Sequence, residues 1–331
     1  MERLCLEEAL LRHDPKERSW AIVGAHDPTY HTRLKVQRST TTTATTTDRT
    51  RIKGEGKNNS TVVESRNDSC IIIMGIGGKP HKLLNMENVA RDNVLVVKRF
   101  SGGGTVVVDH SSLWTTFIGR ENDFPHVQPF PRDIMKWSAD EVFGPAFSSM
   151  KNKILVESTK PLVKKTMVVN TKSCGTAGDG PPISVESSVP MSLDVKSSLN
   201  FALRENDYVL GEKKMGGNAQ SIVKGGWLHH TSFLWDYDND NMSEYLLLPE
   251  KRPDYRGNRV HDDFLVKLGT HFGGTLGHLE GKHFFFEHVK DACVGSFDLE
   301  EVSLEEALEV VDNIGGMQKW YEGKCRTRVV S

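Results

Sequence analysis

Residues Asn93–Val108 read NVLVVKRFSGGGTVVV and place three consecutive glycines between two strand-like runs. Glycine weakens a strand interior, so a glycine triplet is typical of a place where another backbone or a ligand approaches closely. Successive N–H groups in such a turn form an anion-binding concavity, to which Arg99 and Ser101 add a charged fork and a hydroxyl. A glycine-rich hairpin with a solvated Lys98–Arg99 pair explains the same residues. Both interpretations stay open on local chemistry alone.

The composition favours an ordinary globular protein diluted by polar insertions. The chain has 331 residues, with 42 Lys plus Arg against 44 Asp plus Glu, and its hydrophobic content is 37%. This balance of charge gives no general indication of nucleic-acid or membrane-surface binding. The five cysteines include no CxxC pair, which favours a reducing compartment and no structural zinc or disulfide framework. No apolar run approaches the roughly 18 residues that a membrane span needs.

The N-terminal segment carries Glu2, Glu7 and Glu8 inside a helical pattern. Neither a signal peptide nor an acid-poor transit peptide has this character. We therefore expect a soluble, intracellular protein with no visible presequence, in the cytosol or a mitochondrion, and the compartment itself stays open.

Two stretches interrupt the pattern of a packed core. Residues 35–59 contain a Thr-rich run and almost no apolar side chains, so they cannot offset their ordering entropy and are predicted to form a disordered insertion. Residues 151–198 become rich in Gly, Pro and Ser and are predicted to form a loop-rich insertion. Within it, Lys153–Val156 and Met167–Val169 are candidate strands.

Strand-like and helix-like segments alternate along the rest of the chain. Helices are predicted at Cys5–Leu11, His81–Arg91, Pro131–Phe143 with an end at Gly144-Pro145, Asp262–Phe272 and Leu304–Ile314. Strands are predicted at Trp20–Val23, Cys70–Met74, Asn93–Val97, Thr105–Val108, Trp114–Ile118, Phe201–Leu210, around Lys214, and at Trp227–Asp236. This order predicts an α+β fold with mixed or antiparallel β-sheets flanked by helices.

Several motifs, taken in order, resemble the lipoate-protein ligase A family of the biotin and lipoate ligase superfamily. Arg99-Phe100-Ser101-Gly102-Gly103-Gly104, followed by Thr105, Val106 and Asp109, resembles the family's Arg-x-Ser-Gly-Gly-Gly adenylate loop. The other matching segments are Leu6–Arg12, Gly75–Pro80, Asn206-Asp207, Lys214–Ala219 and His229–Ser232. The resemblance implies a class II biotin/lipoate ligase-like catalytic domain of the single-domain type at residues 1–265. Residues 266–331 would be a helical extension packed on that domain.

The resemblance also implies a reaction in two steps. Lipoate is activated with ATP and Mg²⁺ to lipoyl-AMP, and the lipoyl group then passes to a lysine of a lipoyl domain in a 2-oxoacid dehydrogenase subunit or of a glycine-cleavage H protein. A cation must neutralise the carboxylate and the phosphate as they meet, so Lys214 is implied to be the catalytic residue. Lys213 points to the opposite face of a strand. The residues implied to bind substrate or adenylate are Arg99, Ser101, Gly102, Gly103, Gly104, Thr105, Val106, Val107, Gly217, Asn218 and Ala219.

The roles of three further polar residues are less specific. Asp207 is implied to bind magnesium or the nucleotide, and turn capping is the alternative, because Asn-Asp pairs favour turns in any protein. His229 and His230 are predicted to pack or to form hydrogen bonds, since no further metal ligands have suitable spacing. Val108 replaces a histidine that often lines the acyl pocket of the family, so the lipoyl or octanoyl nature of the acyl group stays open.

Alternatives remain within and outside this family. Only residues 266–331 follow the matched segments, which implies either a separate accessory protein or a transferase that uses pre-formed lipoyl-AMP. An octanoyltransferase needs a nucleophilic cysteine, and Cys174 has no neighbour that would activate its thiol. A biotin-protein ligase would carry a Gly-Arg-Gly-Arg-x-Gly loop. A non-catalytic lipoyl-binding protein would have no need of Arg99 and Lys214, and neither a nucleic-acid nor a membrane partner is expected.

Overall fold

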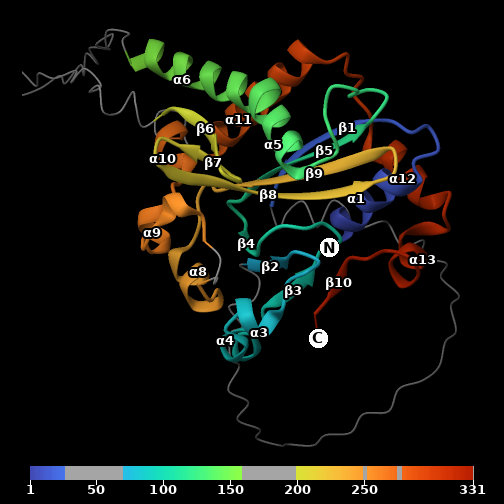
Figure 1. The fold of residues 1–331 in the computed structure, drawn as a ribbon, viewed down its shortest axis with the longest axis horizontal. Coiled ribbons are helices and arrows are strands. Elements are labelled where there is room, and N and C mark those ends of the chain that lie inside the picture. The colour runs from blue at the N-terminus through green and yellow to red at the C-terminus, as the bar shows by residue number, and fades with distance from the viewer. Residues whose placement is uncertain (27–69, 159–198, 249–251, 274–277, 331) are drawn as a thin grey trace, which may run out of the picture.

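The computed structural model describes residues 1–26, 70–158, 199–248, 252–273 and 278–330. Two β-sheets form its centre (Figure 1). The six-stranded sheet has the order β1-β5-β9-β8-β7-β6, and the four-stranded sheet has the order β10-β3-β2-β4. The strands are β1 (Trp20–Ala25), β2 (Cys70–Met74), β3 (Leu95–Lys98), β4 (Val106–Asp109), β5 (Leu113–Arg120), β6 (Phe201–Arg204), β7 (Asp207–Leu210), β8 (Lys213–Val223), β9 (Gly226–Phe233) and β10 (Arg328–Val329).

Helices pack around these sheets. They are α1 (Glu2–His13), α3 (Pro80–Leu83), α4 (Met86–Arg91), α5 (Pro131–Ser138), α6 (Gly144–Ser158), α8 (Asn239–Tyr245), α9 (His261–Phe264), α10 (Leu268–Phe272), α11 (His278–Ser296), α12 (Leu304–Asp312) and α13 (Gly316–Glu322). A π-helical turn, η2 (Ala139–Phe143), joins α5 to α6, and a 3-10 turn, η3 (Asp254–Arg256), precedes α9. Between strands, only β2 with β3 is a parallel pair among those described. The predicted α+β fold with mixed and antiparallel sheets is confirmed.

Helices cover parts of both faces of the six-stranded sheet. Successive side chains of a strand point to opposite faces, and in β5 Phe117 packs with the aromatic core under α5, η2 and α6, whereas Ile118 packs with α1. Figure 1 shows α5, α6 and α11 along one face of this sheet. The sheet is therefore the middle layer between two sets of helices.

Helix α1 is more buried than an amphipathic surface helix. Its residues from Leu4 to Leu11 are all buried, and they include Glu7 and Glu8 at 0% exposure. One side of α1 contacts β9, while α12 and α13 cover another side. The Glu7 carboxylate therefore lies against β5 and β9, and that of Glu8 lies against the C-terminal segment at Arg326.

The helix that begins at Pro131 does not end at Gly144-Pro145. It continues through η2 into α6, because the Gly144 N–H donates to Ala139 O in a π-turn and Pro145 then lies in the first turn of α6, where its missing N–H costs no hydrogen bond. Lys153–Val156 belongs to α6 and not to a strand, so that prediction was wrong. Ile154 packs into the core beneath α11, and this burial stabilises the helical form.

Three other predicted elements are divided in two. The Phe201–Leu210 segment is the hairpin β6–β7, whose turn residue Glu205 adopts a left-handed φ of 53°. The Asp262–Phe272 segment is α9 and α10, because Leu265 between them pairs with Lys214 of β8. The His81–Arg91 segment is α3 and α4, and the Asn85 side chain caps α4 by accepting from Asn88 N.

Several expectations fall outside the described residues. These are the disordered insertion at residues 35–59, the Met167–Val169 strand and Cys174. The described residues after 265 contribute α10 to α13 and also β10, which pairs with β3 at Val97 and Lys98. The domain division at residue 265 stays a prediction. None of the helices in the described ranges has the length and apolar character needed to span a bilayer.

Candidate active site

The glycine loop packs directly against β8. Gly102 N donates to Gln220 O at 2.8 Å. Gly103 has a left-handed φ of 103°, and a methyl group on it would lie 2.7 Å from Asn218 O. A methyl group on Gly75, at the start of the preceding glycine turn, would lie 2.2 Å from Gly103 O. The fold thus brings together three motifs that are far apart in the sequence.

Arg99 binds the loop from inside the protein. Its side chain is 4% exposed, and its Nη2 donates to Gly102 O and Gly104 O, each at 2.9 Å. Nη1 donates to Ile73 O at 3.3 Å, and Nε donates to Ser101 Oγ at 3.1 Å. Burial lowers the pKa of Arg99 to about 10. The guanidinium therefore organises the loop carbonyls, and its direct contact with phosphate stays a prediction.

The outer side of the loop presents hydrogen-bond donors. The N–H groups of Gly103, Gly104 and Thr105 bind no acceptor among the residues that the structure describes. Thr105 Oγ1 is buried and likewise lacks a partner in that part of the chain. Buried polar atoms are normally hydrogen-bonded, so an unpaired one beside exposed N–H groups needs an explanation. Gly103 and Gly104 are exposed residues whose N–H groups are available to an anionic ligand, whereas Thr105 Oγ1 has no accessible surface.

An irregularity in β8 places the Lys214 side chain on the same side of the strand as Gly217. Val209 of β7 pairs with Lys214, but the next residue, Tyr208, pairs with Gly216, so Met215 is an extra residue in a bulge. Lys214 and Gly217 are three positions apart and would face opposite ways in a regular strand. With the bulge, a methyl group on Gly217 would lie 4.0 Å from Lys214 Nζ and 3.7 Å from Val106 Cγ1.

The ammonium group of Lys214 has an acidic partner. Lys214 Nζ lies 2.7 Å from Asp207 Oδ1, and Tyr255 donates its hydroxyl to Asp207 Oδ2 at 2.9 Å. The Lys214 side chain is 26% exposed, whereas that of Asp207 is 8% exposed. Asp207 therefore orients Lys214 at the edge of the site. Lys213 is exposed at the adjoining position.

Asp207 does not resemble a metal ligand in this arrangement. Both of its carboxylate oxygens already accept from donors, and the described ranges contain no group of three acidic, His or Cys side chains that could bind a metal. Magnesium usually binds one or two carboxylates together with substrate phosphates. The magnesium role of Asp207 stays a prediction.

The valines after the loop divide between the site and the core. The Val106 side chain lies beside Gly217, whereas Val107 is 5% exposed and packs in the core between β2, α8 and α9. Val108 shares the face of Val106 because side chains alternate along β4. Ser101 is fully buried behind the loop, so neither its hydroxyl nor the Val107 side chain is an exposed ligand contact.

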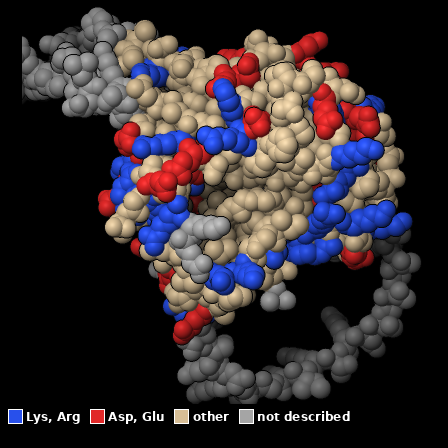
Figure 2. All heavy atoms as spheres, in the orientation of Figure 1, with Lys and Arg blue, Asp and Glu red and all other residues tan. Residues whose placement is uncertain are grey.

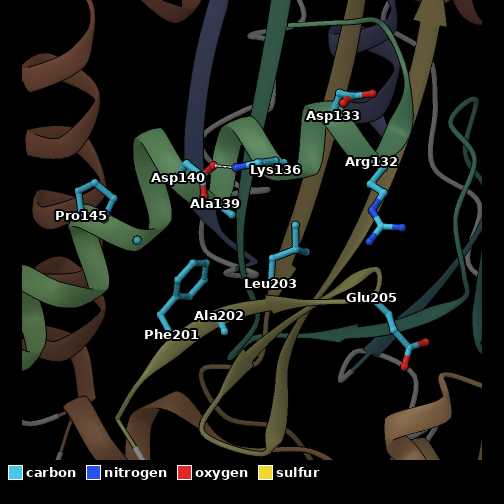
Figure 3. Close-up of a pocket in the computed structure, with 11 residues that line it drawn as sticks. Arg132, Asp133, Lys136, Ala139, Asp140, Pro145, Phe201, Ala202, Leu203 and Glu205 are labelled. Carbon is cyan, nitrogen blue, oxygen red and sulfur yellow. Dashed lines mark hydrogen bonds and ion pairs between the residues drawn. The ribbon is translucent and has the colours of Figure 1, made fainter.

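Charged side chains surround rather than line the central surface. Figure 2 shows Lys and Arg side chains on both sides of a hollowed, largely uncharged area. A separate cavity of about 670 Å³ lies between α5, η2 and β6 (Figure 3). Phe201 and Leu203 are among its apolar residues, and the Lys136–Asp140 ion pair lies beside it. Neither Lys214 nor the glycine loop lines this cavity.

His229 belongs to a buried hydrogen-bond network beneath the site. Its Nε2 lies 3.0 Å from Tyr208 Oη, 3.1 Å from Ser138 Oγ and 3.2 Å from Thr231 Oγ1. Thr231 Oγ1 also donates to Asn218 Oδ1 at 3.0 Å, which connects the network to β8. Burial lowers the pKa of His229 to about 3, so the imidazole is neutral.

This neutral histidine should make the protein sensitive to acid. Unfolded His229 binds a proton below pH 6.5, whereas the folded protein does so only near pH 3, so unfolding takes up a proton in that window and stability falls as the pH falls. Between pH 7 and pH 5 we expect His229 to account for a loss of about 2 kcal/mol in the free energy of unfolding. When the pH falls from 7 to 5, the free energy of unfolding measured in urea should therefore fall less in His229→Gln than in wild type. The exposed-site control His283→Gln should keep the wild-type loss.

Sequence reasoning missed two residues at the site. Tyr255 lies on η3 and had no local signal, because its contact with Asp207 depends on the tertiary structure. Glu7 had a signal: it shares a helical face with Leu4 and Leu11, so a carboxylate there points into the core. The structure places Glu7 2.7 Å from His230 Nε2, next to the glycine loop.

Comparison with known proteins yields a family match over most of the chain. A family model, the lipoyl protein ligase A/B catalytic domain, matches residues 42–178 and 182–297, which is more than half of the chain. The chain belongs to the lipoyl protein ligase A/B family. The family resemblance carried by Arg99–Asp109, Asn206-Asp207 and Lys214–Ala219 is thereby confirmed.

Individual relatives of this ligase-family chain are distant. It is 29% identical over 230 residues to a Plasmodium falciparum (isolate 3D7) protein named inactive lipoate–protein ligase 2, and it spans only 52% of that relative. A solved lipoate-protein ligase A bound with ATP is 13% identical with a TM-score of 0.51, and the alignment covers 98% of this chain and 92% of the other. The bi-partite lipoate protein ligase of Thermoplasma acidophilum is 15% identical with a TM-score of 0.51, and the alignment covers 99% of this chain and 94% of the other. These two likenesses concern the fold.

Proposed function

We propose that this family member activates lipoate with ATP and transfers the lipoyl group to a lysine of a lipoyl domain. The observation that carries the proposal is the convergence of Lys214 Nζ, Gly217 and Val106 on one face of the site. The unpaired donors of Gly103 to Thr105 complete it. A cation and several N–H groups at one place suit a reaction that brings two anions together.

In the first step, an oxygen of the lipoate carboxylate attacks the α-phosphorus of ATP. The bond from that phosphorus to the bridging oxygen breaks, and pyrophosphate leaves with the electron pair. Negative charge grows on the phosphate oxygens as the carboxylate approaches. Lys214, oriented by Asp207, neutralises this charge, while the N–H groups of Gly103 and Gly104 donate to the phosphate.

In the second step, the neutral amine of the acceptor lysine attacks the acyl carbon of lipoyl-AMP. The acyl–oxygen bond breaks, AMP leaves, and an amide forms with loss of a proton from the nitrogen. The acyl chain lies along an apolar wall that includes Val106 and Val108, which accepts a lipoyl or an octanoyl chain alike. The lipoyl domains of 2-oxoacid dehydrogenase subunits and the glycine-cleavage H protein are the proposed acceptors, with a separate accessory protein as a further proposed partner.

One observation favours a second candidate, a non-catalytic lipoyl-binding protein. The Plasmodium relative is named inactive. Arg99 cannot separate the two candidates, because its contacts with Gly102 O and Gly104 O give it a structural role in either case. Lys214 does separate them, because a binder has no need of a cation beside Gly217. The proposed enzyme therefore depends on Lys214 more than on any other residue.

Lipoate-dependent ATP–pyrophosphate exchange tests the proposal directly. We expect exchange with lipoate, because reversal of the first step returns labelled pyrophosphate to ATP. If exchange is absent, transfer of the lipoyl group from synthetic lipoyl-AMP to an apo lipoyl domain, followed by intact mass, identifies a transferase. Binding of lipoyl-AMP with neither exchange nor transfer would contradict catalysis and support the non-catalytic candidate. A parallel series with octanoate decides the acyl preference.

A further inference from the structure

Glu7 is a charged side chain enclosed in the protein next to the glycine loop. It is 0% exposed, and its carboxylate accepts from Thr116 Oγ1 at 2.8 Å through Oε1 and lies 2.7 Å from His230 Nε2 through Oε2. Arg3 Nε is 3.5 Å from Oε1. Nothing in the reaction described above uses this carboxylate, although burying a charge is costly unless it is paired.

His230 connects Glu7 to the loop. Its Nδ1 lies 3.2 Å from Ser101 Oγ, and its ring packs edge-on against Phe100 at 5.8 Å between centroids. Ser101 Oγ in turn accepts from Arg99 Nε at 3.1 Å. A continuous chain of hydrogen bonds thus runs from α1 through β9 to the guanidinium that binds Gly102 O and Gly104 O.

The protonation states give this chain of hydrogen bonds a single direction, in which each donor lies on the Arg99 side and each acceptor on the Glu7 side. Burial lowers the pKa of His230 against the opposing effect of Glu7. Burial raises the pKa of Glu7, but the charge of Arg3 and the hydrogen bonds from the neutral His230 and from Thr116 act against burial, and the pKa is lowered on balance. A neutral imidazole next to a carboxylate donates through Nε2–H, which leaves Nδ1 to accept from the Ser101 hydroxyl. Each link then has one donor and one acceptor, with a cation at one end and an anion at the other.

We propose that Glu7 and His230 are positioning residues that set the orientation of the glycine loop. With Arg99 Nε bound to Ser101, both Nη2 hydrogens remain directed at the carbonyls of Gly102 and Gly104. Carbonyl groups of Gly102 and Gly104 turned inward leave the N–H groups of the same peptide units, those of Gly103 and Thr105, turned outward, where the anion is proposed to bind. The consequence for catalysis rests on the proposed function, but the orientation of the loop does not.

The neighbouring residue Glu8 provides a matched control. It is also 0% exposed on α1, but it accepts from Arg12 Nε at 3.1 Å and from Arg326 N at 2.9 Å. Glu8 therefore supports the C-terminal segment, and none of its hydrogen bonds to residues that the structure describes leads to the loop. Glu7→Gln and Glu8→Gln each remove one buried charge from the same helix with the same change in shape, so a general loss of stability is common to both.

Hydrogen exchange read by mass spectrometry tests the loop without any substrate. We expect the hydrogen-bonded amides of Arg99 and Gly102, in peptides covering Arg99–Thr105, to exchange at least about tenfold faster in Glu7→Gln than in Glu8→Gln. The charge-assisted chain of hydrogen bonds is weakened only in Glu7→Gln. Ser101→Ala removes the middle link with little change in shape and should give the same increase. In the double variant Glu7→Gln/Ser101→Ala, the loop amides should exchange little faster than in either single variant. Equal loop exchange in Glu7→Gln and Glu8→Gln would overturn the proposal, and if Glu7→Gln does not fold, Ser101→Ala against Glu8→Gln decides it.

Kinetics separate this proposal from the proposed function. We expect kcat for lipoate-dependent exchange to fall at least about tenfold in Glu7→Gln with an unchanged KM for lipoate, while Glu8→Gln keeps wild-type values. Isotope-edited NMR of the imidazole should show His230 protonated at Nε2 in wild type and redistributed in Glu7→Gln. A wild-type protein without exchange or transfer would end the proposed function, while the hydrogen-exchange comparison would still decide the role of Glu7. A Glu7→Gln variant as active as Glu8→Gln would overturn the positioning role.

Discussion

Lys214→Gln is expected to lose lipoate-dependent ATP–pyrophosphate exchange by at least about 100-fold, the size of effect seen when one preorganised charge-stabilising group is removed. Lys214 Nζ lies at the meeting point of Gly217, Val106 and Asp207, so its charge acts where phosphate charge grows. Glutamine keeps a donor for Asp207, which would otherwise be a largely buried carboxylate with one partner fewer. The fold should therefore persist.

Lys213→Gln is the control for this loss. Lys213 has the same charge and the adjoining position in β8, but it is exposed. We expect the rate of ATP–pyrophosphate exchange in Lys213→Gln to stay within about twofold of wild type, since surface substitutions away from a site have small effects. Circular dichroism and urea unfolding of both variants check the fold. Exchange at the wild-type rate in Lys214→Gln would remove the proposed mechanism.

Gly103→Ala is expected to abolish exchange and to lower the free energy of unfolding by about 1–3 kcal/mol. Its φ of 103° is strained for any side chain, and the new methyl group would lie 2.7 Å from Asn218 O and 2.8 Å from Arg99 Nη2. The loop must then move away from β8, which separates the N–H donors from Lys214. Urea unfolding and the exchange assay measure the two effects.

Gly104→Ala separates folding from ligand binding at the same loop. A methyl group on Gly104 meets nothing within 4 Å, so we expect the free energy of unfolding to stay the same or to rise by up to about 1 kcal/mol. The methyl group would nevertheless occupy the space where the phosphate is proposed to lie, and exchange should fall. Full exchange in a stable Gly104→Ala variant would show that no ligand approaches this backbone.

Local residue patterns predicted much of the secondary structure for a physical reason. Strand β2 at Cys70–Met74 has the predicted bounds, because a run of this length that is rich in β-branched isoleucine and followed by Gly75 favours a buried strand over a helix. The errors lie where distant contacts outweigh local preference. Ile154 belongs to a helix because it packs into the core beneath α11, and Leu265 interrupts a helical pattern because its backbone pairs with Lys214.

The candidate site shows the same division. The glycine triplet, Arg99 and Lys214 were visible in the sequence because their residue types are unusual for a strand or a turn and match a family pattern. The role of Arg99 was not visible, since nothing in the sequence says that its guanidinium is turned inward to Gly102 and Gly104. Asp207 likewise was predicted as a magnesium ligand or a turn cap, whereas the structure pairs it with Lys214 and Tyr255.

The sequence by itself determined the α+β class, the family and the two charged motifs, because strand alternation, glycine turns and motif order are encoded in neighbouring residues. Only the tertiary structure decided which groups face the ligand and which support it. The bulge at Met215 turns Lys214 toward Gly217, and the packing of α1 on the six-stranded sheet encloses Glu7 between Thr116 and His230. Both results depend on strand register and helix packing, which are interactions between residues that are distant in the chain.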